Sequence, residues 1–111
     1  MKLKLILGSP DDSIVFLEKQ LKNYALDKPL MLLHLAELYH LKKDYHQAIN
    51  YYKQLLEKKP KNVVLMNNIA WNYMLLNDPK AVQMAEKAYK IKPNSADIVD
   101  TYGFILLKNN K

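Results

Sequence analysis

The feature of this 111-residue sequence that most limits its fold is a pattern that returns after one helical hairpin. In residues 29–62, apolar residues recur at intervals of three and four, which places their side chains on one face of an α-helix. A short polar stretch, 41–45, divides the pattern into two predicted helices. Pro60 follows the second, and a proline cannot continue a helix. Because short connections make consecutive helices antiparallel neighbours, the segment predicts a helical hairpin.

The hairpin pattern returns in full over residues 63–95 and in half over residues 96–111. A small residue, Ala36, Ala70 or Gly103, occupies the same register in all three copies. A small side chain at a fixed register indicates that two helices approach closely there. The three copies therefore predict hairpins that stack on one another.

The second copy is one residue shorter than the first. Matching positions are 34 residues apart in the first helices and 33 apart in the second helices. The missing residue therefore falls in the turn between Tyr73 and Ala81. The residues expected to form the repeat core are Leu32, Leu35, Ala36, Tyr39, Ala48, Tyr52, Ala70, Tyr73, Ala81, Ala88 and Gly103.

This pattern resembles the tetratricopeptide repeat family, in which a 34-residue helical hairpin carries small residues at fixed positions and ends near a proline. The resemblance implies an all-α superhelical solenoid of antiparallel hairpins, with repeats at 29–62 and 63–95. Residues 96–111 are then the first helix of a third repeat or a C-terminal cap. Residues 1–28 lack the repeat markers and are expected to form a degenerate helical half-repeat that acts as an N-terminal cap.

The residues of the second repeat resemble a narrower group of proteins within this family. The stretch 67–71, Asn-Asn-Ile-Ala-Trp, and the shortened turn at 77–79 resemble repeats of bacterial proteins from exopolysaccharide-export and protein-sorting systems. Within the N-terminal segment, residues 1–8 are expected to end a helix of an earlier repeat rather than to form a targeting signal, because their apolar run is short.

Composition narrows the class of protein further. The chain has no Cys, which excludes disulfides and thiolate metal sites. Its net charge of +6 comes entirely from Lys, and these lysines cluster near the ends of the predicted second helices, where they offset the helix dipole. Nucleic-acid binding is therefore not expected.

No apolar run is long enough to span a membrane. We therefore expect a soluble chain, which is cytoplasmic by default or lies in the bacterial periplasm or envelope if it belongs to a longer exported protein.

Metal binding and catalysis are the two kinds of chemistry that individual residues of this sequence could support. His34, Glu37 and His40 lie on one side of a predicted helix, and such residues can bind a metal, but no further ligands accompany them. We expect a polar, groove-lining surface and no metal. No nucleophile is paired with a base, and no Gly-rich phosphate loop is present, so neither an enzyme nor a cofactor is expected.

The family resemblance implies a concave groove, lined by the first helices of the hairpins, that binds a protein or peptide. The positions that match the family's contact sites are His34, Glu37, His40, Asn67, Asn68, Trp71, Met74, Asp100, Thr101 and Phe104. The Asn pair can bond a peptide backbone, because an amide side chain both donates and accepts. Trp71 and Phe104 can act as aromatic anchors, although packing between helices is an equal alternative for Trp71.

The acidic residues of this expected groove disfavour a carboxylate ligand. Glu37 and Asp97 stand where family members that bind a C-terminal carboxylate carry basic residues, so we expect a basic or neutral peptide. The sequence thus predicts a non-enzymatic interaction scaffold. The alternative is a structural, self-associating segment that forms a homodimer through the apolar run 104–107 in its last helix.

Overall fold

The computed structural model describes residues 9–23 and 28–109, so the helix end expected at residues 1–8 lies outside the described part of the chain. Within that part, the chain forms α-helices and no strand. The helices are α2 (Pro10–Asn23), α3 (Lys28–Leu41), α4 (Tyr45–Lys58), α5 (Val63–Leu75), α6 (Lys80–Ile91) and α7 (Ala96–Asn109). No described helix has the length and apolar character needed to cross a membrane.

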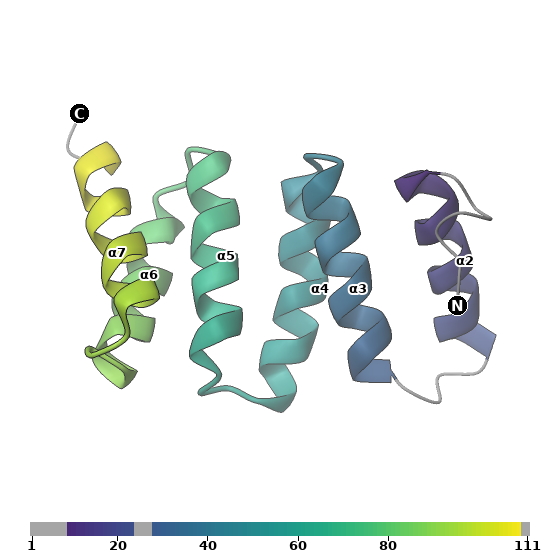
Figure 1. The fold of residues 1–111 in the computed structure, drawn as a ribbon, viewed down its shortest axis with the longest axis horizontal. Helices are drawn as coiled ribbons and strands as arrows, with labels where there is room; N and C mark the ends of the chain where they lie inside the picture. Colours follow the sequence, from purple (N-terminus) through teal and green to yellow (C-terminus); the bar gives the residue numbers. More distant parts are fainter. Residues whose placement is uncertain (1–8, 24–27, 110–111) are drawn as a thin grey trace.

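The helices stand in an elongated row that measures 43 × 27 × 21 Å (Figure 1). Helices α3 and α4 pack as one antiparallel hairpin, and α5 and α6 pack as a second. Helix α7 packs on both α5 and α6, and in Figure 1 α4 lies behind α3 while α6 lies behind α7. This arrangement confirms the expected all-α helical-repeat fold.

Polar side chains next to the helix ends explain where several helices begin. Ser9 accepts a hydrogen bond from the backbone N–H of Asp12 (3.2 Å), and Asp44 accepts one from Gln47 (3.3 Å). Asn62 does the same for Leu65 at the start of α5 (3.0 Å). Each bond satisfies a backbone donor that has no partner inside its helix.

The turns of the two hairpins have the same geometry. The backbone N–H of Asp44 donates to the carbonyl of Tyr39 over 2.9 Å, and that of Asp78 donates to the carbonyl of Tyr73 over the same distance. The residue before each aspartate has a positive φ, 66° at Lys43 and 58° at Asn77. Because the turns match at a spacing of 34, the missing residue lies after Asp78, in the first turn of the following helix.

Most residues expected in the repeat core are buried. These are Leu32, Leu35, Ala36, Ala48, Tyr52, Ala70, Tyr73, Ala81 and Ala88. Tyr39 is only half-buried, because its hydroxyl extends to Glu18 on α2. The expectation for Gly103 is wrong: it is exposed, and a Cβ built there would meet nothing within 4 Å. Its counterpart Ala70 is covered on all sides, whereas no described helix covers this side of α7.

One carboxylate of α2, that of Glu18, links this helix to both helices of the first hairpin. The hydroxyls of Tyr39 and Tyr51 both donate to the same oxygen of Glu18, at 2.8 and 2.9 Å. The two rings are stacked, with centroids 5.7 Å apart. Burial, followed by the hydrogen bond to Glu18, raises the pKa of Tyr51 to about 12 and the pKa of Tyr39 further.

Candidate binding sites

The first helices of the hairpins and α7 expose a set of side chains that we name the first-helix face. Its side chains are spaced by three or four residues on α3 and α7 and by seven and four on α5, so each set forms a stripe. The face consists of Leu30, His34, Glu37 and Leu41 on α3, Val64, Trp71 and Leu75 on α5, and Asp97, Asp100, Phe104 and Leu107 on α7.

An aromatic pair occupies the part of this face that spans α5 and α7. The rings of Trp71 and Phe104 are stacked, with centroids 5.5 Å apart and an angle of 26° between their planes. Trp71 remains 36% exposed and Phe104 44% exposed. Trp71 therefore packs on the neighbouring helix α7 and is still partly exposed, and its role as a binding anchor stays a prediction.

The first-helix face carries little positive charge. Helix α5 has no charged residue, and Glu37, Asp97 and Asp100 are the exposed acidic residues on either side of it. The exposed lysines of α4 and α6, such as Lys53 and Lys87, belong to the second helices. The surface charge is thus divided between the two kinds of helix.

His40 was expected to line the groove, but its side chain packs between helices and contacts Asn72. Its Nδ1 lies 2.9 Å from Oδ1 of Asn72, whose Nδ2 donates to the carbonyl of Asn68 over 2.7 Å. Because Oδ1 can only accept, His40 Nδ1 carries the hydrogen in this bond. Asn72, which is 1% exposed, was not singled out in the sequence, although an Asn among the apolar positions of a helix is a detectable signal.

Two further expected groove residues are not available to a partner. Met74 and Thr101 are buried, since each faces the neighbouring helices rather than solvent. Asn67 and Asn68 are half-buried. The expected groove residues that reach the surface fully are His34, Glu37, Trp71, Asp100 and Phe104.

The possible metal ligands do not converge. His34 and Glu37 lie 3.8 Å apart and both are exposed, while His40 turns away toward Asn72. Among the described residues, no group of three or more His, Cys, Asp or Glu side chains could hold a metal ion.

A cleft of about 880 Å³ lies where the start of α3, the end of α4 and the start of α5 meet. Leu33, Leu55 and Leu65 line it, as do Leu30 and Val64 from the first-helix face. Asn68 is the one expected groove residue in its lining. Sequence reasoning missed this cleft because it arises from the separation of two consecutive hairpins, which no local pattern encodes.

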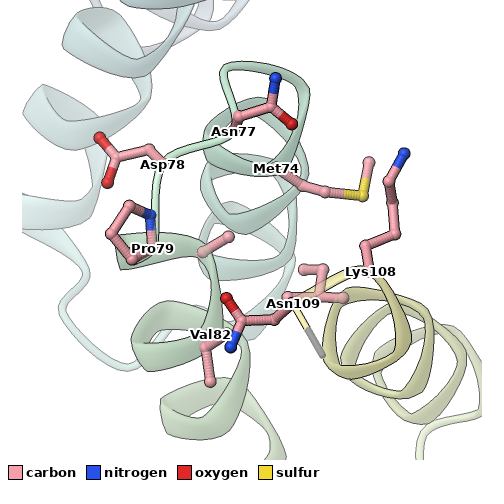
Figure 2. A pocket seen from close by; sticks show the side chains of 9 residues that line it. Met74, Asn77, Asp78, Pro79, Val82, Lys108 and Asn109 are labelled. Atoms are coloured by element: carbon pink, nitrogen blue, oxygen red, sulfur yellow. The ribbon is translucent and has the colours of Figure 1, made fainter. Parts of the chain in front are cut away.

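A smaller pocket, of about 240 Å³, lies between α5, the start of α6 and the end of α7 (Figure 2). Met74 and Pro79 line it, and the residues at the matching positions of the first hairpin are His40 and Tyr45. Those two rings are in contact, with centroids 5.6 Å apart. The pocket is thus explained by Pro79, which is smaller than Tyr45, and by the shortened helix start of the second hairpin.

Comparison with known families agrees with this architecture. Residues 30–62, which hold α3, the turn and α4, match the sequence model of the tetratricopeptide repeat family. No curated protein matches the chain. The match to a tetratricopeptide repeat, together with the helical-repeat fold, supports a protein-interaction scaffold in general.

Proposed function

We propose that this protein is a non-enzymatic scaffold that binds a peptide or helical segment of a partner protein on the first-helix face. The observation that carries the proposal is the exposed, stacked pair of Trp71 and Phe104. Aromatic side chains supply much of the binding energy at protein interfaces, and a contiguous apolar surface on a folded chain typically marks an interaction site.

The charge of the face favours a basic or neutral partner segment. Glu37, Asp97 and Asp100 are acidic, and the helix between them, α5, is uncharged. A segment with Lys or Arg beside apolar residues would pair with these carboxylates and cover the aromatic pair. Asn67, which is half-buried near this surface, can bond a peptide backbone.

The test is a selection of peptides from a displayed library, followed by titration of labelled peptides. We expect selected peptides to be neutral or basic and to bind Trp71→Ala roughly tenfold more weakly than the unchanged chain, because an aromatic anchor is lost. Tyr89→Ala is the matched control, since Tyr89 is an exposed aromatic on α6 that pairs with Tyr102. Equal losses in the two variants would contradict the proposal.

Self-association is a second candidate, favoured by the outer side of α7. Val99, Tyr102 and Leu106 are exposed or half-buried, whereas their counterparts in α5, which are Met66, Ile69 and Tyr73, are buried. The expected contact at 104–107 needs correction, because Ile105 is buried and Phe104 stacks on Trp71. Light scattering after size exclusion would reveal a dimer, and a monomer at all protein concentrations would reject this candidate.

Other inferences from the sequence stay predictions. They are the repeat boundaries at 29–62, 63–95 and 96–111, the capping role of residues 1–28, the relation to bacterial export systems, the compartment and the absence of nucleic-acid binding.

A further inference from the structure

The cleft at the junction of α3, α4 and α5 has an apolar floor. Leu33 and Leu55 are half-buried there and Leu65 is buried, while Leu30 and Val64 stand exposed at its mouth. Its volume of about 880 Å³ lies within the range of roughly 300–1,000 Å³ that is usual for ligand pockets in proteins. The cleft can therefore enclose several apolar side chains of a ligand.

The rim of the cleft is basic. Lys28, Lys58 and Lys59 line it, against a single acidic residue, Glu57. All three lysines are exposed, and none forms an ion pair with another described residue. This charge is opposite to that of the first-helix face, so the two surfaces select different ligands.

Three amide side chains also line the cleft, and one of them, Asn62, already accepts a hydrogen bond from the N–H of Leu65. Gln54 and Asn68 are half-buried, and the side chain of neither makes a hydrogen bond within the described part of the chain. An amide offers both a donor and an acceptor, which suits the alternating N–H and C=O groups of a peptide backbone. An acyl chain or another purely apolar ligand would leave both amides unpaired.

We propose that this cleft is a second binding site, which takes a short acidic, leucine-rich segment of a partner protein. Its apolar side chains lie on Leu33, Leu55 and Leu65, its backbone bonds the two amides, and its carboxylates lie beside the three lysines. The site shares Leu30 and Val64 with the first-helix face but does not include Trp71 or Phe104. The proposal therefore does not depend on peptide binding at that aromatic pair.

The test uses a fluorescent synthetic hexapeptide, Leu-Glu-Leu-Leu-Glu-Leu with blocked ends, and a matched peptide with Lys in place of both Glu. We expect the acidic peptide to bind roughly tenfold more tightly than the basic one, with the difference shrinking as salt screens the charges. Binding is measured by fluorescence anisotropy. Equal binding of the two peptides, or no binding of the acidic one, would overturn the proposal.

Two pairs of variants place the binding within the cleft. Val64→Glu adds a negative charge at the mouth, and Val15→Glu on α2 is its control, since Val64 is 64% exposed and Val15 is 65% exposed. Lys58→Glu reverses a charge on the rim, and Lys87→Glu on α6 is its control. We expect the cleft variants to weaken binding roughly tenfold and the controls to leave it unchanged.

The folding of every variant is checked by its circular dichroism and melting temperature, so that lost binding is not confused with lost structure. A control that weakens binding as much as its cleft partner would overturn the proposal. Trp71→Ala is expected to leave binding of the acidic peptide unchanged. Failure at this cleft can therefore be distinguished from failure of the proposed function at the first-helix face.

Discussion

At the scale of the residue, His40 links two consecutive hairpins through a single hydrogen bond. Its bond to Asn72 joins α3 to α5, and Asn72 is buried. His40→Ala should lower the free energy of unfolding by about 1–3 kcal/mol, because a buried acceptor loses its partner. The measurement is a denaturant titration.

The matched control for that prediction is His34→Ala, since His34 is an exposed histidine on the same helix. It should change the free energy of unfolding by less than about 0.5 kcal/mol, as surface substitutions usually do. Equal destabilisation by the two variants would contradict a specific contribution of the bond between His40 and Asn72, because both substitutions change helix propensity alike.

The pair of Ala70 and Gly103 gives a second prediction, because the two residues share one register in different surroundings. Ala70→Leu should cost about 1–3 kcal/mol, since this fully buried position has no room for a larger side chain. Gly103→Ala should instead stabilise the chain by about 0.5–1 kcal/mol, because a helical glycine with open space around it gains from a Cβ. Melting curves of the two variants test both signs, and destabilisation by Gly103→Ala would contradict the open space around this position.

The sequence predicted burial best where a residue repeats within a complete hairpin. Ala36, Ala48 and Ala81 are buried as their register requires. The prediction that Gly103 is buried is wrong because burial also depends on a covering helix, and none is described beyond α7. His40, Met74 and Thr101 fall at family contact positions, yet their exposure depends on the spacing between neighbouring hairpins, which a single-helix pattern does not contain.

At the scale of the element, α2 packs on α3, and Glu18 links it by hydrogen bonds to both helices of the first hairpin. Glu18→Ala should lower the free energy of unfolding by about 1–3 kcal/mol, because two phenols lose a charged acceptor. In a repeat array each unit contacts only its neighbours, so the effect should be local. Hydrogen exchange should quicken in α2 and stay unchanged in α5, α6 and α7.

Glu57→Ala, an exposed substitution on α4, is the control for this prediction. Faster exchange throughout the chain of Glu18→Ala would contradict a local effect on α2.

The same attachment predicts a dependence on alkaline pH. Burial raises the pKa of Tyr51 and of Tyr52 from 10.0 to about 12, helped by the charges of Glu18 and Glu37 respectively. Because these pKa values are higher in the folded state, their stabilising contribution is complete below pH 10 and is lost as the pH rises from 10 to 12. The unfolding midpoint should therefore fall across this interval.

Phenolate absorbance provides the direct check of that prediction. Tyr39, Tyr51 and Tyr52 should ionise above pH 10, the ordinary pKa of a tyrosine hydroxyl. In Glu18→Ala, Tyr39 and Tyr51 should ionise at lower pH while Tyr52 is unchanged. Ionisation of Tyr39 and Tyr51 at the same pH in the unchanged chain and in Glu18→Ala would contradict the contact with Glu18.

At the scale of the whole molecule, the fold divides its surface chemistry between two layers. The first-helix face exposes aromatic, other apolar and acidic residues, and α4 and α6 expose lysines such as Lys53 and Lys87. The helical-repeat fold could be predicted from the sequence because its 34-residue period is local and repeated. The cleft could not, because it depends on how far α3 and α5 separate at their starts.

The central claim is that the first-helix face is a peptide-binding surface. The most direct test is to map amide chemical-shift changes in the isotopically labelled chain as a library-selected neutral or basic peptide is added. We predict that the changes concentrate on α3, α5 and α7 around Trp71 and Phe104, and leave the lysine-rich surfaces of α4 and α6 unaffected. Changes confined to α4 and α6, or to the outer side of α7, would contradict the claim.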